Sequence, residues 1–102
     1  MIRHCAFFRF QSDLSEEEIG SLLEGFVGLK DEVDGMVDVV VGPNLSAEGL
    51  SQGFDHGIVM DFTDTAAVEA YLVHPAHLAL AARVVPKLDG GLDGALPFDF
   101  EL

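Results

Sequence analysis

The order in which the apolar periodicity changes along this chain is the feature that most restricts its fold. Residues 2–10 alternate with a period of two, as in a strand, and residues 14–29 repeat with the period of an amphipathic helix. Alternation returns at 36–42, 56–62 and 95–102, and a second helical pattern spans 65–88. The order β-α-β-β-α-β predicts an α+β, ferredoxin-like split β-α-β domain, with a four-stranded antiparallel sheet and helices on one face.

Capping residues mark where the predicted helices begin. Ser15 followed by Glu18 is a capping-box signature, and Asp64 is placed to cap the second helix. Pro75 must interrupt that second helix, because proline lacks an N–H and clashes with the preceding turn. Proline is tolerated at the first position of a helix, so we expect His74 to cap a new helix that begins at Pro75.

Length and charge restrict the class of protein. The 102 residues predict one domain, 1–102, and no apolar run approaches the ~20 residues that a membrane span needs. A net charge of −13 repels phosphate and anionic lipid, which argues against nucleic-acid and membrane partners. Arg3 and His4 are followed by alternation instead of a continuous apolar stretch, so we expect no signal peptide. A lone Cys5 fits a reducing cytoplasm, where we expect the protein to act.

Both faces of the predicted sheet carry apolar residues. Phe7 and Val59 point away from the face that holds His4 and His56. A single layer of helices covers one face only, and an uncovered apolar face is an association surface. We therefore predict a homodimer in which two sheets pack face to face and close their edges into a barrel. Three residues of the second strand are expected to share one face: Val37, Val39 and Val41.

Histidines and the only tyrosine are the candidate chemical groups. If the helices cover the face that holds His4 and His56, both imidazoles point into the same apolar layer as Tyr71, although antiparallel strands can place the two histidines at opposite ends of the sheet. An apolar layer with a few convergent polar groups is the usual form of a small-molecule site. A histidine titrates near neutral pH and can take or give a proton, and His77 lies close by in the third helical segment.

Four stretches of the chain together carry a family resemblance. "MIRHCAFFRF", "EGLSQGFDHGIVMDF", "AVEAYLVHPAHLAL" and the terminal "FDF" resemble the stress-responsive dimeric α/β-barrel (Dabb) family over nearly the whole chain. The resemblance implies the same split β-α-β fold and a homodimeric barrel. Some members resemble polyketide cyclases, in which a Tyr and a His perform acid–base work in a pocket between sheet and helices.

The resemblance assigns catalytic residues and a pocket. The matching catalytic residues are Tyr71 and His77, with His4 and His56 as further polar groups. The chain has Phe26 where the cyclising members carry a pocket tyrosine, and it lacks a tryptophan near Leu88. The ligand-binding side chains expected in the apolar layer are Ala6, Phe8, Leu23, Phe26, Ile58, Met60, Leu72, Leu80 and Leu88.

Three functions follow from these residues. The first is binding of a small, largely apolar, carbonyl-bearing or polyketide-like molecule. The second is a cofactor-free cyclase or lyase, in which His77 is the base and Tyr71 the donor to the developing enolate oxygen. No cofactor is needed when the substrate's own carbonyls acidify its C–H bonds. The third is a structural stress protein whose pocket is filled by side chains.

Two other kinds of site are disfavoured. His74 and His77 have the i, i+3 spacing of two metal ligands, but Pro75 disturbs the helix and no third ligand follows at a fixed spacing. We therefore predict no metal site. Cys5 alternates away from His4, which argues against a Cys–His nucleophilic pair.

Overall fold

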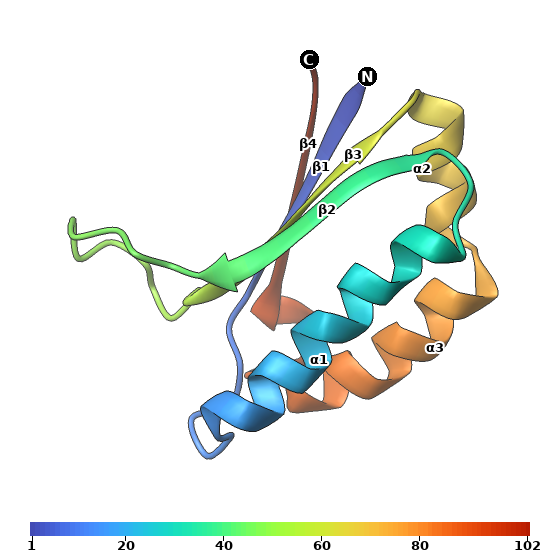
Figure 1. The fold of residues 1–102 in the computed structure, drawn as a ribbon. Coiled ribbons are helices and arrows are strands. Elements are labelled where there is room, and N and C mark those ends of the chain that lie inside the picture. Colours follow the sequence, from blue (N-terminus) through green and yellow to red (C-terminus); the bar gives the residue numbers. More distant parts are fainter.

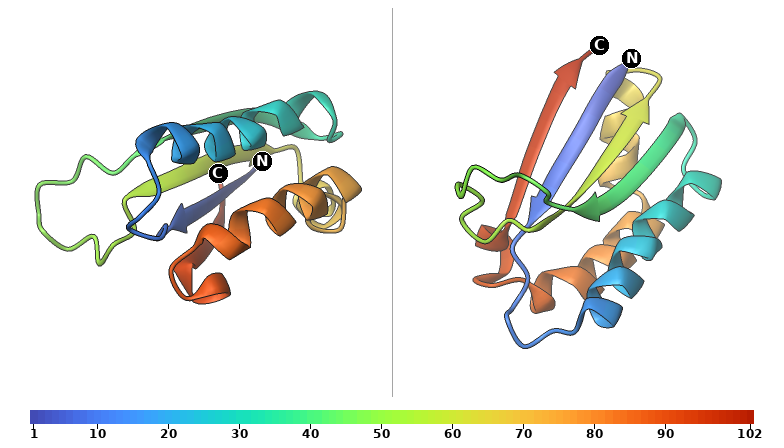
Figure 2. Two further views of the ribbon diagram at one scale, coloured as in Figure 1. Left: turned by 90° about the horizontal axis from the view of Figure 1, so that it is seen from below. Right: turned by 60° about the vertical axis from the view of Figure 1, so that its left-hand side comes forward.

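The fold is a two-layer α+β domain, described for all of residues 1–102 by a computed structural model. The strands form one antiparallel sheet in the order β2-β3-β1-β4, with the three α-helices on one of its faces (Figure 1; Figure 2, right). None of the helices is both long and apolar enough to cross a membrane. The elements are β1 (Ile2–Phe8), α1 (Glu16–Gly28), η1 (Leu29–Asp31), β2 (Met36–Pro43), β3 (His56–Phe62), α2 (Thr65–Leu72), α3 (Pro75–Val84), η2 (Val85–Lys87), η3 (Gly91–Gly94) and β4 (Ala95–Glu101).

The predicted helix starts are confirmed by their capping hydrogen bonds. The Ser15 and Asp64 side chains each accept a hydrogen bond from the backbone N–H three residues further on, at 3.1 and 2.8 Å. At the third helix, the Nδ1 atom of His74 accepts from the Ala76 N–H at 3.0 Å, and Pro75 is the first helical residue. The helical pattern of residues 65–88 is therefore two helices with a break between them, followed by the 3₁₀ turn η2.

The core lies between the helices and the face of the sheet that was predicted to meet them. The alternating sets of β1 and β3 that contain His4 and Ile58 are largely buried there, with Met60 and Phe62 completely enclosed. Apart from the Tyr71 phenol, His4 is the one buried polar side chain of the domain. A buried imidazole needs hydrogen-bond partners, which marks His4 as a residue whose surroundings are specific.

The opposite face of the sheet is open and apolar. Strand β4 contributes most of it, because Ala95, Pro97 and Asp99 pair with the helix-facing residues of β1 and the residues between them point outward. The position of β4 at the edge of the sheet agrees with the prediction from Pro97. The large apolar side chains exposed on this open face are Phe7, Val40, Leu96, Phe98 and Phe100.

The expectation that three valines of β2 share one face is wrong. A β-bulge between Met36 and Asp38 shifts the register by one residue, so alternation is lost at the start of the strand. Val39 is consequently buried in the core, whereas Val37 is 45% exposed. The open face is apolar as predicted, but β2 supplies it with different residues.

The His74 cap should make a measurable contribution to the free energy of unfolding. Substitution of a capping side chain by alanine typically costs about 1 kcal/mol. We expect His74→Ala to lower the free energy of unfolding by about 1 kcal/mol, as urea denaturation followed by circular dichroism would measure. The matched variant His74→Asn replaces the Nδ1 acceptor by a side-chain oxygen that can accept the same hydrogen bond, and it should retain most of that stability. Equal losses in both variants would show that the side chain of residue 74 does not act as a cap.

Candidate functional site

The break between α2 and α3 creates the position of His77. In a continuous helix, the Leu72 carbonyl would accept a hydrogen bond from the N–H of Ala76, four residues on. Here the Ala76 N–H donates to His74 instead, and Pro75 has no N–H to offer. The Leu72 carbonyl is therefore left for another donor, which is Nδ1 of His77 at 3.2 Å.

This contact determines which nitrogen of the His77 ring carries the hydrogen. A carbonyl oxygen only accepts, so Nδ1 of His77 carries the hydrogen and Nε2 keeps its lone pair. Burial lowers the pKa of His77 below its ordinary value of 6.5, while the Leu72 carbonyl acts in the opposite direction and is outweighed. The ring is thus held neutral near pH 7, with Nε2 available as a base.

Tyr71 lies beside His77 and reaches the same interior. The two rings are 4.3 Å apart between centroids, and Tyr71 is only 1% exposed. Burial raises the pKa of its phenol far above the ordinary 10.0, because the phenolate would lose its hydration. Tyr71 therefore remains a neutral phenol, which is a hydrogen-bond donor, at any physiological pH.

His4 approaches the Tyr71 ring from β1. Its ring centroid lies 5.7 Å from that of Tyr71. Nδ1 of His4 is 2.6 Å from a carboxylate oxygen of Asp99, its direct partner in the β1–β4 register. A carboxylate accepts, so Nδ1 of His4 donates and the imidazole is fixed in orientation. The Tyr71 ring consequently has two oriented imidazoles as neighbours.

A cavity of about 320 Å³ connects these three side chains. That volume is at the lower end of the range for small-molecule sites, about 300–1,000 Å³. The cavity lies between the sheet, α3 and the segment that leads into β4. It contains His4, Tyr71 and His77, together with six of the predicted ligand-binding residues: Ala6, Phe8, Phe26, Ile58, Leu72 and Leu88.

The other predicted ligand-binding residues lie elsewhere in the core. Leu23, Met60 and Leu80 are buried but do not line the cavity. Leu80 packs towards α1, where a Cβ added at Gly25 would come within 2.8 Å of its methyl carbon. The cavity thus occupies only the part of the interior that lies beneath α3 and β4.

Sequence reasoning missed part of the lining and the carboxylate behind His4. Asp99 could have been found from the β4 alternation, since it follows Ala95 and Pro97 at intervals of two. The missed residues of α3 and η2 follow His77 at helical intervals of four, seven and eight. The additional lining residues are Ala81, Val84, Val85, Leu92, Ala95 and Pro97.

His56 is not part of this cavity. The β1–β3 register pairs His4 with Met60 and His56 with Phe8, so four residues, or about 13 Å, separate the two histidines along the ladder. His56 turns towards the start of α1, where its Nε2 is 3.4 Å from a carboxylate oxygen of Glu16. The expectation that His56 joins the other candidates in one site therefore fails, because equivalent faces do not imply equal depth along the strands.

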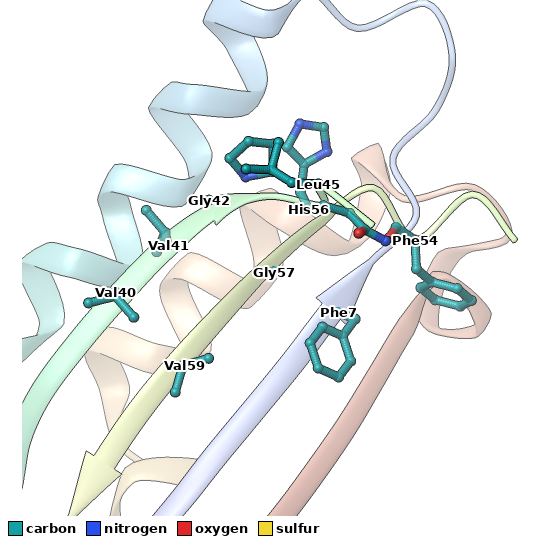
Figure 3. Close-up of a pocket in the computed structure, with 11 residues that line it drawn as sticks. Phe7, Val40, Val41, Gly42, Leu45, Phe54, His56, Gly57 and Val59 are labelled. Carbon is teal, nitrogen blue, oxygen red and sulfur yellow. The ribbon is translucent and has the colours of Figure 1, made fainter. Parts of the chain in front are cut away.

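A second hollow lies near His56, at the edge of the open face. It has a volume of about 440 Å³ and is lined by Phe7, Val40 and Val59 of the sheet and by the loop that follows β2 (Figure 3). It lacks Tyr71 and His77 and offers His56 as its one titratable side chain. The hollow continues the apolar open face and carries no acid–base pair.

The chemical capacity of the cavity is general acid–base catalysis. His77 can accept a proton at Nε2, and the Tyr71 phenol can donate a hydrogen bond to an oxygen that gains negative charge. No group of three His, Cys, Asp or Glu side chains is arranged to hold a metal ion. The fold and site define a ferredoxin-like domain with an apolar cavity that contains two imidazoles and a phenol.

The chain matches a known family over nearly its full length. Residues 2–101 match the profile of the Stress responsive A/B Barrel Domain family, Dabb. The protein therefore belongs to the Dabb family, which confirms the resemblance seen in its sequence.

Individual relatives agree with this assignment. The stress-response A/B barrel domain-containing protein HS1 of Arabidopsis thaliana is 30% identical over 100 residues, covering 98% of this chain and 88% of the relative. Olivetolic acid cyclase of Cannabis sativa is 22% identical over 77 residues, or 76% of each chain. A dimeric ferredoxin-like protein of unknown function from Jannaschia superposes with a TM-score of 0.88 at 30% identity, covering 99% of this chain and 98% of the other.

The lowered pKa of His77 predicts an acid sensitivity. The unfolded chain binds a proton near pH 6.5 and the folded ring resists it, so this residue makes stability fall as the pH drops below 6.5. We expect His77→Gln, which cannot titrate, to flatten the decline in the free energy of unfolding between pH 6.5 and about pH 5. Urea denaturation at both pH values measures this, and parallel declines in the two proteins would contradict it.

Proposed function

We propose that the cavity binds a small, largely apolar carbonyl compound and transfers protons on it by cofactor-free acid–base catalysis. One observation carries this proposal: the His77 ring, whose Nδ1 donates to the Leu72 carbonyl and whose Nε2 is therefore unprotonated, lies 4.3 Å between centroids from the Tyr71 ring, and both residues line one apolar cavity. A base and a hydrogen-bond donor that share one small cavity match the needs of enolisation.

The proposed reaction begins at a C–H bond next to the ligand's carbonyl. Nε2 of His77 takes the proton, the C–H electrons form an enolate, and the Tyr71 hydroxyl donates a hydrogen bond to the enolate oxygen. In a ligand with a second carbonyl, the enolate carbon attacks that carbon, and the new alkoxide takes a proton from His77. This closes an aldol ring and restores both side chains. The similarity to olivetolic acid cyclase, at 22% identity, supports a ring-closing version of this step.

Binding without turnover is the second candidate function. The lining of the cavity is mostly aliphatic and aromatic, which is sufficient for affinity without catalysis. A purely structural stress protein is less well supported, because an open volume of about 320 Å³ beside three polar side chains sacrifices packing. A measurement of turnover distinguishes acid–base catalysis from binding without turnover.

Exchange of ligand hydrogens for deuterium tests the proposed reaction directly. The exchange of the α-hydrogens of 4-phenylbutan-2-one in D₂O, followed by proton NMR, reports enolisation without requiring the natural ligand. We expect the protein to accelerate exchange and His77→Gln to reduce that acceleration about 100-fold or more, since positioned general bases typically contribute 10²–10⁴-fold.

The matched control for this test is His56→Gln. It makes the same chemical change outside the cavity and should leave the exchange rate unchanged. Loss of exchange in both variants, or in neither, would contradict the role of His77. If both the protein and His77→Gln bind the ketone and neither accelerates exchange, binding without turnover is the function.

We further propose that the protein is a homodimer formed through the open face. Five large apolar side chains on that face are exposed in the single chain, and a contiguous apolar surface of this kind marks an interface. The dimeric ferredoxin-like protein from Jannaschia, which covers 99% of this chain, supports the same assembly. Packing of two sheets would bury the open face.

A charge placed on the open face should separate the subunits. Phe98 is 59% exposed on β4 and Leu78 is 54% exposed on α3, so the two residues are matched in exposure. We expect Phe98→Glu to convert the dimer to a monomer in sedimentation equilibrium, because a buried carboxylate without a partner is costly. Leu78→Glu should remain dimeric. A dimer in both variants would place the interface elsewhere.

A further inference from the structure

We infer that the cavity selects electroneutral carbonyl compounds and rejects those that carry a carboxylate or a phosphate. This inference deepens the proposed function and rests on it. It concerns the charge of the ligand, which neither the reaction class nor the family determines. The positions of the positive charges of the chain support it.

No lysine or arginine lines the cavity. Its polar side chains are the Tyr71 phenol and the imidazoles of His4 and His77, and the rest of the lining is almost entirely apolar. Transfer of an anion into such surroundings is expensive unless a cation or several donors replace its water. An uncharged ketone or ester loses far less hydration and needs only the hydrogen bond that Tyr71 offers.

The imidazoles do not supply the missing positive charge. Any charge on His4 is already opposed by the Asp99 carboxylate, 2.6 Å from its Nδ1. His77 is held neutral by burial, which lowers its pKa. An anionic ligand would therefore meet one carboxylate behind His4 and no uncompensated cation.

The five lysines and arginines of the chain lie elsewhere. Three of them are engaged by carboxylates at 4.0 Å or less, namely Arg3 by Asp61, Arg9 by Asp89 and Lys30 by Asp38. The remaining two, Arg83 and Lys87, line a separate groove between α1 and α3. That groove contains none of the cavity residues.

The charge of the whole molecule acts in the same direction. A net charge of −13 produces a negative potential that slows the approach of anions and leaves neutral molecules unaffected. Salt screens this long-range component, with a Debye length of about 10 Å at 0.1 M, but it does not restore hydration inside the cavity. Selection against anions should therefore weaken in high salt without disappearing.

An isosteric pair of ligands tests the inference. The amide 7-oxooctanamide and the carboxylate 7-oxooctanoate share the same ketone and chain and differ in charge at the far end. Tyr71 is the only tyrosine and the chain has no tryptophan, so tyrosine fluorescence reports this cavity alone. Titration of each ligand, with calorimetry as a second readout, gives the two dissociation constants.

We expect the amide to bind at least tenfold more tightly than the carboxylate at low salt, with a smaller gap in 0.5 M NaCl. Equal or tighter binding of the carboxylate would overturn the inference and leave the proposed function standing. Failure of the amide to bind would remove the proposed function, and the inference with it.

A charge introduced at the mouth of the cavity provides a gain-of-binding test. Leu92 lines the cavity and is 73% exposed, so Leu92→Lys places a cation at the mouth. Leu78→Lys changes the net charge equally on a surface outside the cavity. We expect Leu92→Lys alone to tighten carboxylate binding severalfold, with amide binding little changed. Equal effects of the two variants would mean that the local absence of cations does not set the selectivity.

Discussion

The hydrogen bond between the His77 ring and the Leu72 carbonyl is the contact on which the site depends. It exists because the chain interrupts its own helix: Pro75 brings no N–H, and His74 takes the N–H of Ala76. The carbonyl that this releases fixes both the position of His77 and the nitrogen that carries its proton. A local irregularity of the backbone thus places an imidazole with an unprotonated Nε2 in the lining of the cavity.

The cavity combines this base with an environment that keeps its groups uncharged. Burial favours the neutral forms of His77 and Tyr71, so a proton acceptor and a hydrogen-bond donor coexist near neutral pH. Nδ1 of His4 donates to the Asp99 carboxylate at the edge of the sheet, and this contact orients the imidazole. No lysine or arginine lines the cavity, and we infer that this limits which ligands bind.

Local patterns in the sequence predicted the strands, the capped helices, the position of the break and the apolar open face. They also predicted that His4, Tyr71 and His77 face one interior. These patterns did not determine the register of the strands, because register is set by pairing between strands that are distant in the sequence. In the structure, His56 lies four residues from His4 along the β1–β3 ladder, and Asp99 pairs with His4 across the β1–β4 ladder. The β-bulge, which buries Val39 and exposes Val37, could not be predicted for the same reason. The shape of the cavity within the core likewise depends on how helices and sheet pack together.

The tautomer of His77 decides whether Nε2 is free to act as a base, and NMR can measure it. Two-dimensional long-range NMR correlation of the imidazole nitrogens with the carbon-bound ring hydrogens, in uniformly ¹⁵N-labelled protein, distinguishes a protonated Nδ1 from a protonated Nε2. At neutral pH, the structure predicts a neutral ring with the hydrogen on Nδ1 and a free lone pair on Nε2. A ring that is protonated on Nε2, or charged on both nitrogens, would contradict it.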